Sequence, residues 1–410
     1  MKKLKFLTDE DLDKALLQRL ADDFFRQYEY LFEKTSSSIR MSFLKMITRK
    51  CQQEYQELIE LNMRYDAWFR KIHACKSITD LASIHQTLNN ISADIFLNTK
   101  SVMDVHQRCT FYRDKLTLKV LSLTKSEMEK STARPENAFA WIRMGSTGRD
   151  EQTLVTDQDN LLVYKNKKDK SYYQEFAARA VNNLESIGFN RCKGKIMPTN
   201  DKWFGTLSEW RAKLHTYIVD SENLVDLIVL TDAKYAGGNY PLAQAFISEA
   251  RKVLKMYHAS FKAIAKATVL MPIALTIFRN FKTEKKGEYK DMLNIKFQAW
   301  LPLIMITLLF SLENDVWETN TMKRIKALED MKLFEPYFTD ELLESYIILT
   351  YLKIVLQIDY MRGNSTNLTY FINPYTLDKK NRSDLKRALS TVEKFQRLAS
   401  SSYNISEDAL

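Results

Sequence analysis

Apolar residues recur every three to four positions along the first third of the chain, a spacing typical of amphipathic helices. Thr8 is placed to cap the first of these helices, and acidic residues follow in its first turn. A second helix is predicted after the polar run at 35–38, and two more between Asp80 and about Lys130. The apolar stripes of the first two helices consist of Leu17, Leu20, Phe24, Tyr28 and Leu31, and of Phe43, Ile47, Cys51, Tyr55, Leu58 and Leu61.

The pattern changes at 131–135, a short polar stretch ending in proline that we interpret as a linker. Short apolar runs then alternate with helical stretches. The runs at 138–144, 160–165 and 224–235 are predicted to be strands, and the last is the most strand-like in the chain. Helices are predicted at 172–188 and at 206–218, where Thr206 provides a cap.

From Pro241 to about Ser400 the periodicity is helical again, with interruptions near 283–288, 335–336 and 373–374. The most apolar run extends from Ala299 to Phe310 and contains Pro302. It is shorter than the roughly 20 residues that a membrane span needs. We therefore predict a buried helix at this position and no membrane span.

These patterns predict an α+β protein that is predominantly helical. The expected organisation is a helical extension at 1–76, a helical region at 77–134, an α/β core at 135–240 and a helical domain at 241–410. Only 9 glycines and 7 prolines occur among 410 residues, which argues against a turn-rich all-β fold. A core of roughly 100 residues is small for a domain, so we expect it to pack against its helical flanks.

The net charge of +10 suits a partner that carries phosphate, although a basic protein without such a partner explains it equally well. The four cysteines lie far apart, so neither a zinc knuckle nor a disulfide framework is supported. The opening residues turn acidic at once and lack the pattern of a secretory signal. We expect a cytoplasmic protein. No nucleic-acid-binding motif is present.

The segment from Met144 to Tyr164 carries the candidate chemistry. Gly145 and Ser146 follow a predicted strand, where a glycine lets the backbone approach a phosphate and a serine adds donors. Asp157 and Asp159 stand at the head of the next strand, and positions i and i+2 of a strand share a face. Two such carboxylates suit Mg²⁺ or Mn²⁺, and paired metals can clamp both oxygens of a phosphoryl displacement.

A strand, Gly-Ser, a ten-residue spacer and Asp-x-Asp together resemble the DNA polymerase beta-like nucleotidyltransferase superfamily. The longer string GSTGRDEQTLVTDQDN resembles one branch more closely, the nucleotidyltransferase domain of bacterial signal-transduction proteins. That branch is similar to the uridylyltransferases that modify the PII nitrogen-signalling protein. The likeness extends over about residues 77 to 402. It implies a nucleotidyltransferase core with a small mixed sheet between helical domains, and a role in signal transduction.

The resemblance also implies roles for single residues. Asp157, Asp159 and a third carboxylate would be catalytic and would bind the metals. The family's later Asp-x-Arg has its nearest match at Asp232 and Lys234, with lysine in the arginine position; Asp220 and Asp226 are the alternatives. The residues implied to bind nucleotide are Gly145, Ser146, Arg149, Asn200 and Lys234.

Each of these assignments has a structural alternative. The two aspartates could be solvated turn residues, and Ser146 could be an ordinary helix cap. Arg149 and Glu151 could form an ion pair that shapes the loop, and Asn200 could be a turn residue. Lys193, Lys195 and Lys202 could be surface charges or could meet the triphosphate.

The sequence therefore predicts a metal-dependent nucleotidyltransferase. An acceptor hydroxyl would attack the α-phosphate of a nucleoside triphosphate and release pyrophosphate. The resemblance to the uridylyltransferases favours a protein as acceptor. Two alternatives stay open: a nucleotide-binding regulatory protein without turnover, and an enzyme that makes a small nucleotide signal or extends RNA.

Overall fold

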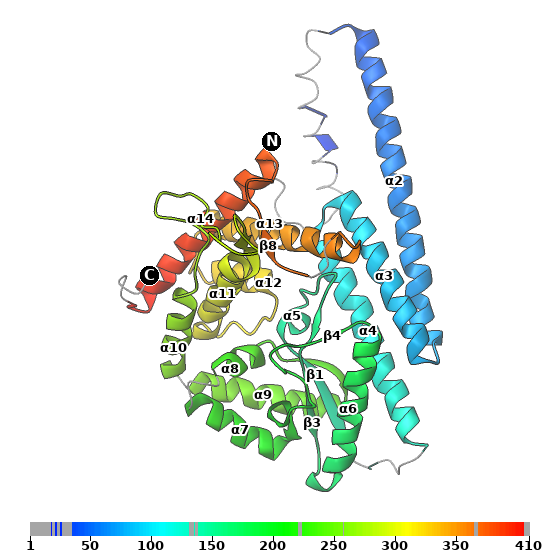
Figure 1. The fold of residues 1–410 in the computed structure, drawn as a ribbon, viewed down its shortest axis with the longest axis vertical. Coiled ribbons are helices and arrows are strands. Elements are labelled where there is room, and N and C mark those ends of the chain that lie inside the picture. Colours follow the sequence, from blue (N-terminus) through cyan, green and yellow to red (C-terminus); the bar gives the residue numbers. More distant parts are fainter. Residues whose placement is uncertain are drawn as a thin grey trace. The chain divides into compact units, whose positions relative to one another are not determined.

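The computed structural model describes residues 18, 21–22, 25–26, 35–130, 135, 138–219, 224–256, 258–364 and 368–405. It is a predominantly helical α+β protein with a small mixed sheet, as predicted (Figure 1). The chain separates into two compact units, residues 1–62 and 63–410. The predicted first helix, the linker at 131–135 and Asp220 fall mostly or wholly outside the described residues.

Three helices precede the sheet: α2 (Ser37–Ala74), α3 (Ile78–Thr99) and α4 (Val102–Met128). The side chain of Ser77 accepts a hydrogen bond from the Asp80 amide and so caps α3, and Ser101 caps α4 in the same way. α3 packs on α4, and α4 packs on α6 (Lys170–Ser186) beside the sheet. The helical periodicity of this region therefore predicted its structure correctly.

The main sheet has the strand order β5-β3-β1-β6, from β1 (Phe139–Arg143), β3 (Asn160–Tyr164), β5 (Phe204–Thr206) and β6 (Lys234–Gly238). β1 is antiparallel to β3 and to β6, whereas β3 and β5 are parallel. Phe139 and Trp141 of β1 contact Phe176 of α6 on one face. The alternate residues Ala140 and Ile142 face the opposite side, as the two-residue period of a strand requires.

The opposite face of the sheet is covered by α7 (Leu207–Val219) and α9 (Tyr240–Met256), which contribute Trp210 and Phe246 to a common core. Thr206 and Glu209 form a reciprocal capping box at the start of α7: the Thr206 amide donates to the Glu209 carboxylate, and the Glu209 amide donates to the Thr206 hydroxyl. The predicted cap at Thr206 is confirmed.

The prediction of a strand at 224–235 is wrong. This run forms a helix, α8 (Leu224–Leu230), and the strand β6 begins only at Lys234. A short, continuously apolar run has no period that distinguishes a strand from a buried helix. Leu227 and Leu230, three residues apart, are both buried against the core under α7 and α9, and this packing selects the helix.

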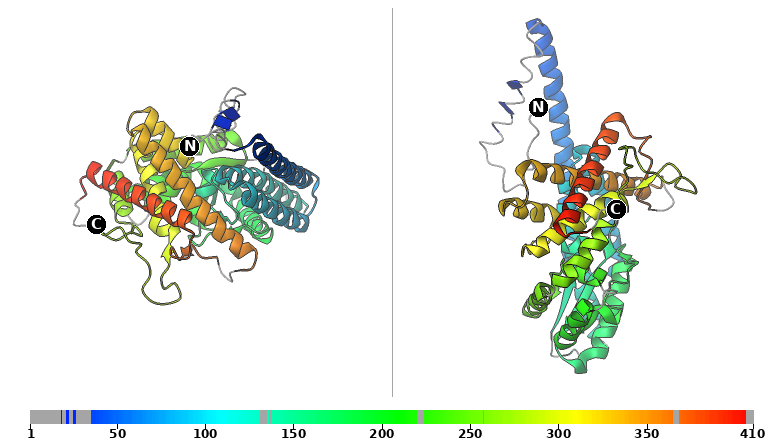
Figure 2. Two further views of the ribbon diagram at one scale, coloured as in Figure 1. Left: turned by 90° about the horizontal axis from the view of Figure 1, so that it is seen from above. Right: turned by 90° about the vertical axis from the view of Figure 1, so that its left-hand side faces the viewer.

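The C-terminal helices are α10 (His258–Val269), α11 (Leu301–Glu313), α12 (Thr321–Asp330), α13 (Pro336–Met361) and α14 (Lys379–Ser402). A short pair of strands, β7 (Leu293–Asn294) and β8 (Phe371–Ile372), lies beside them. Figures 1 and 2 show these helices grouped at one end of the 63–410 unit, with the sheet at the other.

The apolar run at 299–310 lies mainly in α11, which is buried on nearly all sides and stacks Phe310 on Phe395 of α14. The stretch Lys296–Glu313 is the single described helix long and apolar enough to cross a membrane, but 72% of it is buried inside the protein. The prediction of a buried helix is therefore confirmed.

Candidate active site

The two aspartates of the Asp-x-Asp motif lie where one short strand ends and the next begins. Asp157 belongs to β2 (Asp157–Gln158), which pairs with β4 (Asn190–Arg191), and Asp159 directly precedes β3. The side chain between them, Gln158, is buried and donates hydrogen bonds to the carbonyl oxygens of Val181 and Phe189. Because alternate residues point to opposite faces, this anchor directs both aspartates away from α6.

Gly145 brings the backbone against the acid pair. It opens the short helix α5 (Gly145–Gly148) with a φ of +56°, in the region that favours glycine. A Cβ atom at this position would lie 2.5 Å from Oδ2 of Asp159. The Met144 amide also donates to the carbonyl oxygen of Asp159, at 2.8 Å. The predicted juxtaposition of Gly145 with the Asp-x-Asp motif is therefore present.

The carboxylate of Asp159 is poorly compensated. Burial, together with the neighbouring charge of Asp157, raises its pKa to about 6, and a hydrogen bond from the Cys192 thiol acts in the opposite direction. Its Oδ1 atom is buried and has no hydrogen-bond partner among the described residues. Asp157 is exposed, yet desolvation also raises the pKa of its carboxyl, opposed by the charges of Lys296, Lys353 and Lys193.

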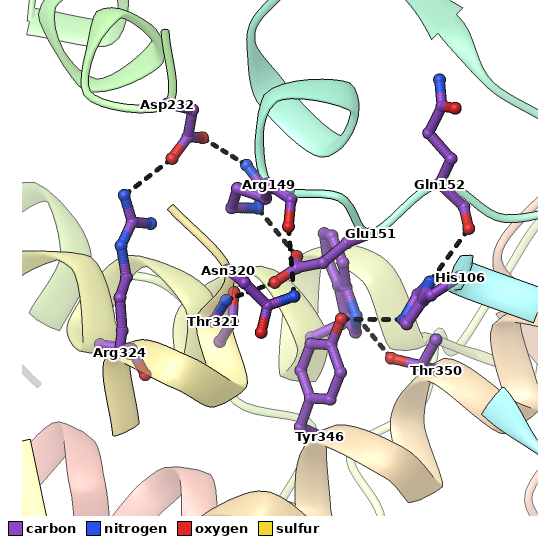
Figure 3. A network of polar contacts seen from close by, with 12 residues as sticks. His106, Arg149, Glu151, Gln152, Asp232, Asn320, Thr321, Arg324, Tyr346 and Thr350 are labelled. Atoms are coloured by element: carbon purple, nitrogen blue, oxygen red, sulfur yellow. Dashed lines mark hydrogen bonds and ion pairs between the residues drawn. The ribbon is translucent and has the colours of Figure 1, made fainter. Parts of the chain in front are cut away.

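The loop between the two halves of the motif is held by a buried network of ion pairs (Figure 3). The Arg149 guanidinium donates to Glu151 at 2.9 Å and to Asp232 at 2.6 Å. The other oxygen of Asp232 accepts from Arg324 of α12, at 2.9 Å. The second oxygen of Glu151 accepts from the backbone amide of Thr321. Arg149, predicted to bind nucleotide, thus lies in the ion pair that was its structural alternative.

Asp232 does not complete a three-carboxylate site. Both of its oxygens are bonded to arginines, and no group of three acidic, histidine or cysteine side chains that could hold a metal forms among the described residues. The predicted metal triad of Asp157, Asp159 and Asp232 is therefore corrected. The physical reason is that two guanidinium groups hold Asp232 in a turn after α8. Of the alternatives, Asp226 is paired with Lys202 at 3.0 Å.

The remaining predicted nucleotide ligands lie in different surroundings. Lys234 at the start of β6 forms an ion pair with Asp150, which also pairs with Arg143 at 3.0 Å. Asn200 accepts from the Lys202 amide and caps a 3₁₀ helix at Asp201–Trp203, so its role here is that of a turn residue. Ser146 is half-buried, next to Gly145. Nucleotide binding by these residues stays a prediction.

Two family models match the chain. "Putative nucleotidyltransferase DUF294" matches residues 86–223, and "Putative nucleotidyltransferase substrate binding domain" matches residues 258–403. Together they cover most of the sequence. The chain belongs to this nucleotidyltransferase family. No curated protein matches the chain. The first match includes the acid pair and Gly145, and the second includes the helices α10 to α14.

The region matched by the second family model contributes basic and aromatic side chains that the sequence analysis missed. Lys353 of α13 is 7% exposed, and its Nζ lies 4.3 Å from the centre of the Trp300 ring. Burial, together with the charges of Lys296 and Arg149, lowers the pKa of Lys353 to about 7. Lys296 itself lies 5.0 Å from the ring centre of Tyr370. Because both lysines lie far from the motif in the sequence, no local pattern connects them with the acid pair.

The same domain clamps the motif loop. Gln357 of α13 accepts from the amide of Val155 and donates to its carbonyl oxygen. From the other side, Arg113 of α4 donates to the carbonyl oxygens of Thr153 and Leu154. His106 of α4 bonds to the Gln152 carbonyl oxygen and to the Tyr346 hydroxyl (Figure 3). The loop that leads to the acid pair is thus fixed by α4 and by α13.

Proposed function

We propose that this protein is a metal-dependent nucleotidyltransferase that transfers a nucleoside monophosphate from a nucleoside triphosphate to an acceptor hydroxyl and releases pyrophosphate. The observation that carries the proposal is the carboxylate of Asp159. The residue is half-buried, but its Oδ1 atom is fully buried and has no partner in the described part. It lies against a glycine turn inside a matched nucleotidyltransferase domain. A buried oxygen of this kind is costly unless it binds something.

The acid pair fits a magnesium ion. Mg²⁺ prefers oxygen ligands and is commonly held by one or two carboxylates together with the phosphates of the substrate. Asp157 and Asp159 supply the two carboxylates, and the unpartnered Oδ1 of Asp159 supplies a free lone pair. When bound, the ion would neutralise the charge that develops on the phosphate oxygens during transfer. Mn²⁺ has the same ligand preference.

The chain's own residues bind and orient the reactants. Gly145 has no side chain, so the phosphate chain can approach the backbone at the start of α5, where the first amides of a helix lack partners within it. The hydroxyl oxygen of the acceptor forms a bond to the α-phosphorus, and the bond from that phosphorus to the bridging oxygen breaks. Pyrophosphate leaves, and the hydroxyl proton is released to solvent.

The acceptor that we propose is a hydroxyl on a protein, and signal transduction is the corresponding role. The support is the resemblance of the motif to uridylyltransferases that modify a signalling protein. A small-molecule acceptor and RNA are the other outcomes of the experiment below. The compartment that we expect for this activity is the cytoplasm.

A second candidate function has one specific observation in its favour. No third carboxylate joins Asp157 and Asp159 among the described residues. The protein could thus bind nucleotide as a regulatory device without turning it over. The intact Asp-x-Asp beside Gly145, inside the matched nucleotidyltransferase domain, favours the enzyme.

The experiment that separates these functions uses each of the four nucleoside triphosphates, labelled on the α-phosphate, with Mg²⁺ or Mn²⁺ and a cell lysate. We expect label from one of them in a protein band, and none with Asp157→Ala/Asp159→Ala. Label in RNA or in a small molecule would change the acceptor. Tight nucleotide binding without any transfer would establish the regulatory protein, and absence of both would overturn the proposal.

A further inference from the structure

Lys353 is an ammonium group buried without a counter-ion. No ion pair in the described ranges includes it, whereas Lys202, Lys255 and Lys394 all pair with carboxylates. Its contact is instead the face of Trp300, at 4.3 Å. The two cations Lys296 and Arg149 both disfavour its charged form. A buried lysine without a counter-ion makes the fold less stable, which indicates that it is retained for a function other than stability.

The backbone under Trp300 is also unusual. Residues Lys296–Trp300 form a turn of π-helix, closed by a hydrogen bond from the Leu301 amide to the Lys296 carbonyl oxygen, before α11 begins. Single π turns are rare and frequently occur at functional sites. Here the turn carries Lys296 at its start and Trp300 at its end. The Trp300 ring is fixed by a bond from its Nε1 to the Thr350 hydroxyl of α13, at 3.0 Å.

Both lysines lie on elements that pack beside the acid pair. Lys353 is one helical turn before Gln357, whose side chain holds the backbone of Val155, two residues before Asp157. Lys296 belongs to the π-helical turn that packs on α13. Neither lysine forms an ion pair with Asp157 within the described part of the chain. The space beside the exposed Asp157 is therefore bordered by two cations from the C-terminal domain. A ligand there would carry several negative charges and accept hydrogen bonds from ammonium groups, which is the chemistry of a polyphosphate.

We infer that Lys353 and Lys296 bind the phosphate chain of the nucleoside triphosphate across the boundary between the core and the C-terminal domain. This inference rests on the proposed function for the identity of the ligand. It assigns to the C-terminal domain the phosphates of the donor nucleotide, and not only the acceptor. It also explains why Gln357 bonds α13 to the motif loop: the lysines and the acid pair must stay at a fixed distance to bind one phosphate chain.

The test is calorimetric binding of inorganic tripolyphosphate to the full chain in EDTA, so that neither metal nor transfer is involved. We expect Lys353→Met and Lys296→Met each to weaken binding about tenfold or more, the usual worth of a charge-assisted hydrogen bond. The matched control is Lys394→Met, which removes a lysine that also contacts an aromatic ring, Phe338 at 4.6 Å, but has a carboxylate partner. It should leave binding unchanged within twofold.

Melting temperature separates a binding lysine from a structural one. Lys353→Met should melt at or above the wild-type temperature, because it removes an uncompensated buried charge. If Lys353→Met melts lower, Lys296→Met alone decides, since Lys296 is only half-buried. Unchanged tripolyphosphate binding in Lys296→Met and in a folded Lys353→Met would overturn the inference.

The outcome is independent of the acid pair. Asp157→Asn/Asp159→Asn should bind tripolyphosphate in EDTA at least as tightly as wild type, because two negative charges are removed. If that variant transfers nucleotide normally, the role proposed for the acid pair fails while the lysine site stands. If neither protein transfers nucleotide, the proposed function fails, and tripolyphosphate binding by the lysines is judged independently. If transfer requires the aspartates but tripolyphosphate binding is unchanged when either lysine is replaced, the lysine site fails and the proposed function stands.

Discussion

Glu151 and Asp159 lie eight residues apart in the motif, and their charges are compensated to opposite extents. Glu151 and Asp232 have a partner for each of their four carboxylate oxygens, supplied by Arg149, Arg324 and a backbone amide (Figure 3). Asp159 has an oxygen with no partner among the described residues.

A buried charge whose partners are all in place keeps a loop in one conformation, and the loss of one partner is severe. A buried charge without partners makes the fold less stable and persists only where a ligand compensates it. By this criterion Arg149, Glu151 and Asp232 hold the loop, whereas Asp159 and Lys353 serve the ligand. Stability measurements on single variants test the difference.

The largest effect is expected for Arg324→Met. It leaves one oxygen of the buried Asp232 without its partner, and breaking a buried pair from one side costs about 3–5 kcal/mol. Urea denaturation gives this free energy of unfolding. Arg397→Met, which removes a surface arginine paired with Glu393, is the control and should change stability by less than about 1 kcal/mol. Equal effects of the two variants would remove the distinction between the networks.

Lys353→Met should have the opposite sign. The folded protein lowers the pKa of Lys353 from 10.5 to about 7, so the unfolded state binds the proton more tightly. The wild type therefore gains stability as pH rises from about 7 to 10.5. We expect the variant to be more stable by about 4 kcal/mol at pH 7, an advantage that nearly disappears at pH 10.5. An advantage independent of pH would show that the ammonium charge is not its cause.

Asp159→Asn should also stabilise the protein, with the reverse dependence on pH. The folded state raises the pKa of Asp159 from 3.8 to about 6, so the folded state binds the proton more tightly. The wild type loses stability as pH rises from about 4 to 6. The gain of the variant should be small near pH 4 and reach about 3 kcal/mol at pH 7. A loss of stability at pH 7 would mean that Asp159 is a structural residue.

The smallest effect is expected for Lys234→Met. Lys234 pairs with Asp150, and the two side chains are 42% and 36% exposed. Surface pairs of this kind contribute about 0–1 kcal/mol. If Lys234 also binds nucleotide, as the resemblance implies, the KM for the triphosphate should rise while the free energy of unfolding hardly changes. A large loss of stability would place Lys234 with the buried network instead.

Local patterns predicted most of the fold. Helical spacing identified α2 to α4, the capping box at Thr206 marked α7, and the apolar run at 299–310 became the buried helix α11. The wrong prediction at 224–235 has a physical cause. Leu224–Leu230 is apolar at every position but one, so it shows no period that distinguishes a helix from a strand, and tertiary packing determines that it is a helix.

The site was predictable only where it is local. Gly145 and the acid pair follow from spacing, and the structure brings them together. The placement of Asp232 depended on a strand that does not exist, and its partner Arg324 lies 92 residues further on. Lys353 and Lys296 reach the site through the packing of the C-terminal domain, for which the sequence has no short-range signal.

The central claim is that the unpartnered carboxylates exist to bind metal with nucleotide. The most direct measurement is calorimetric binding of a nucleotide analogue that cannot be cleaved after the α-phosphate, with and without Mg²⁺, to wild type and to Asp157→Asn/Asp159→Asn. The account predicts that Mg²⁺ tightens binding to the wild type at least about tenfold, the worth of one charge-assisted contact, and does not tighten binding to the variant. The variant should melt at or above the wild-type temperature. An equal effect of Mg²⁺ on both proteins would contradict the account.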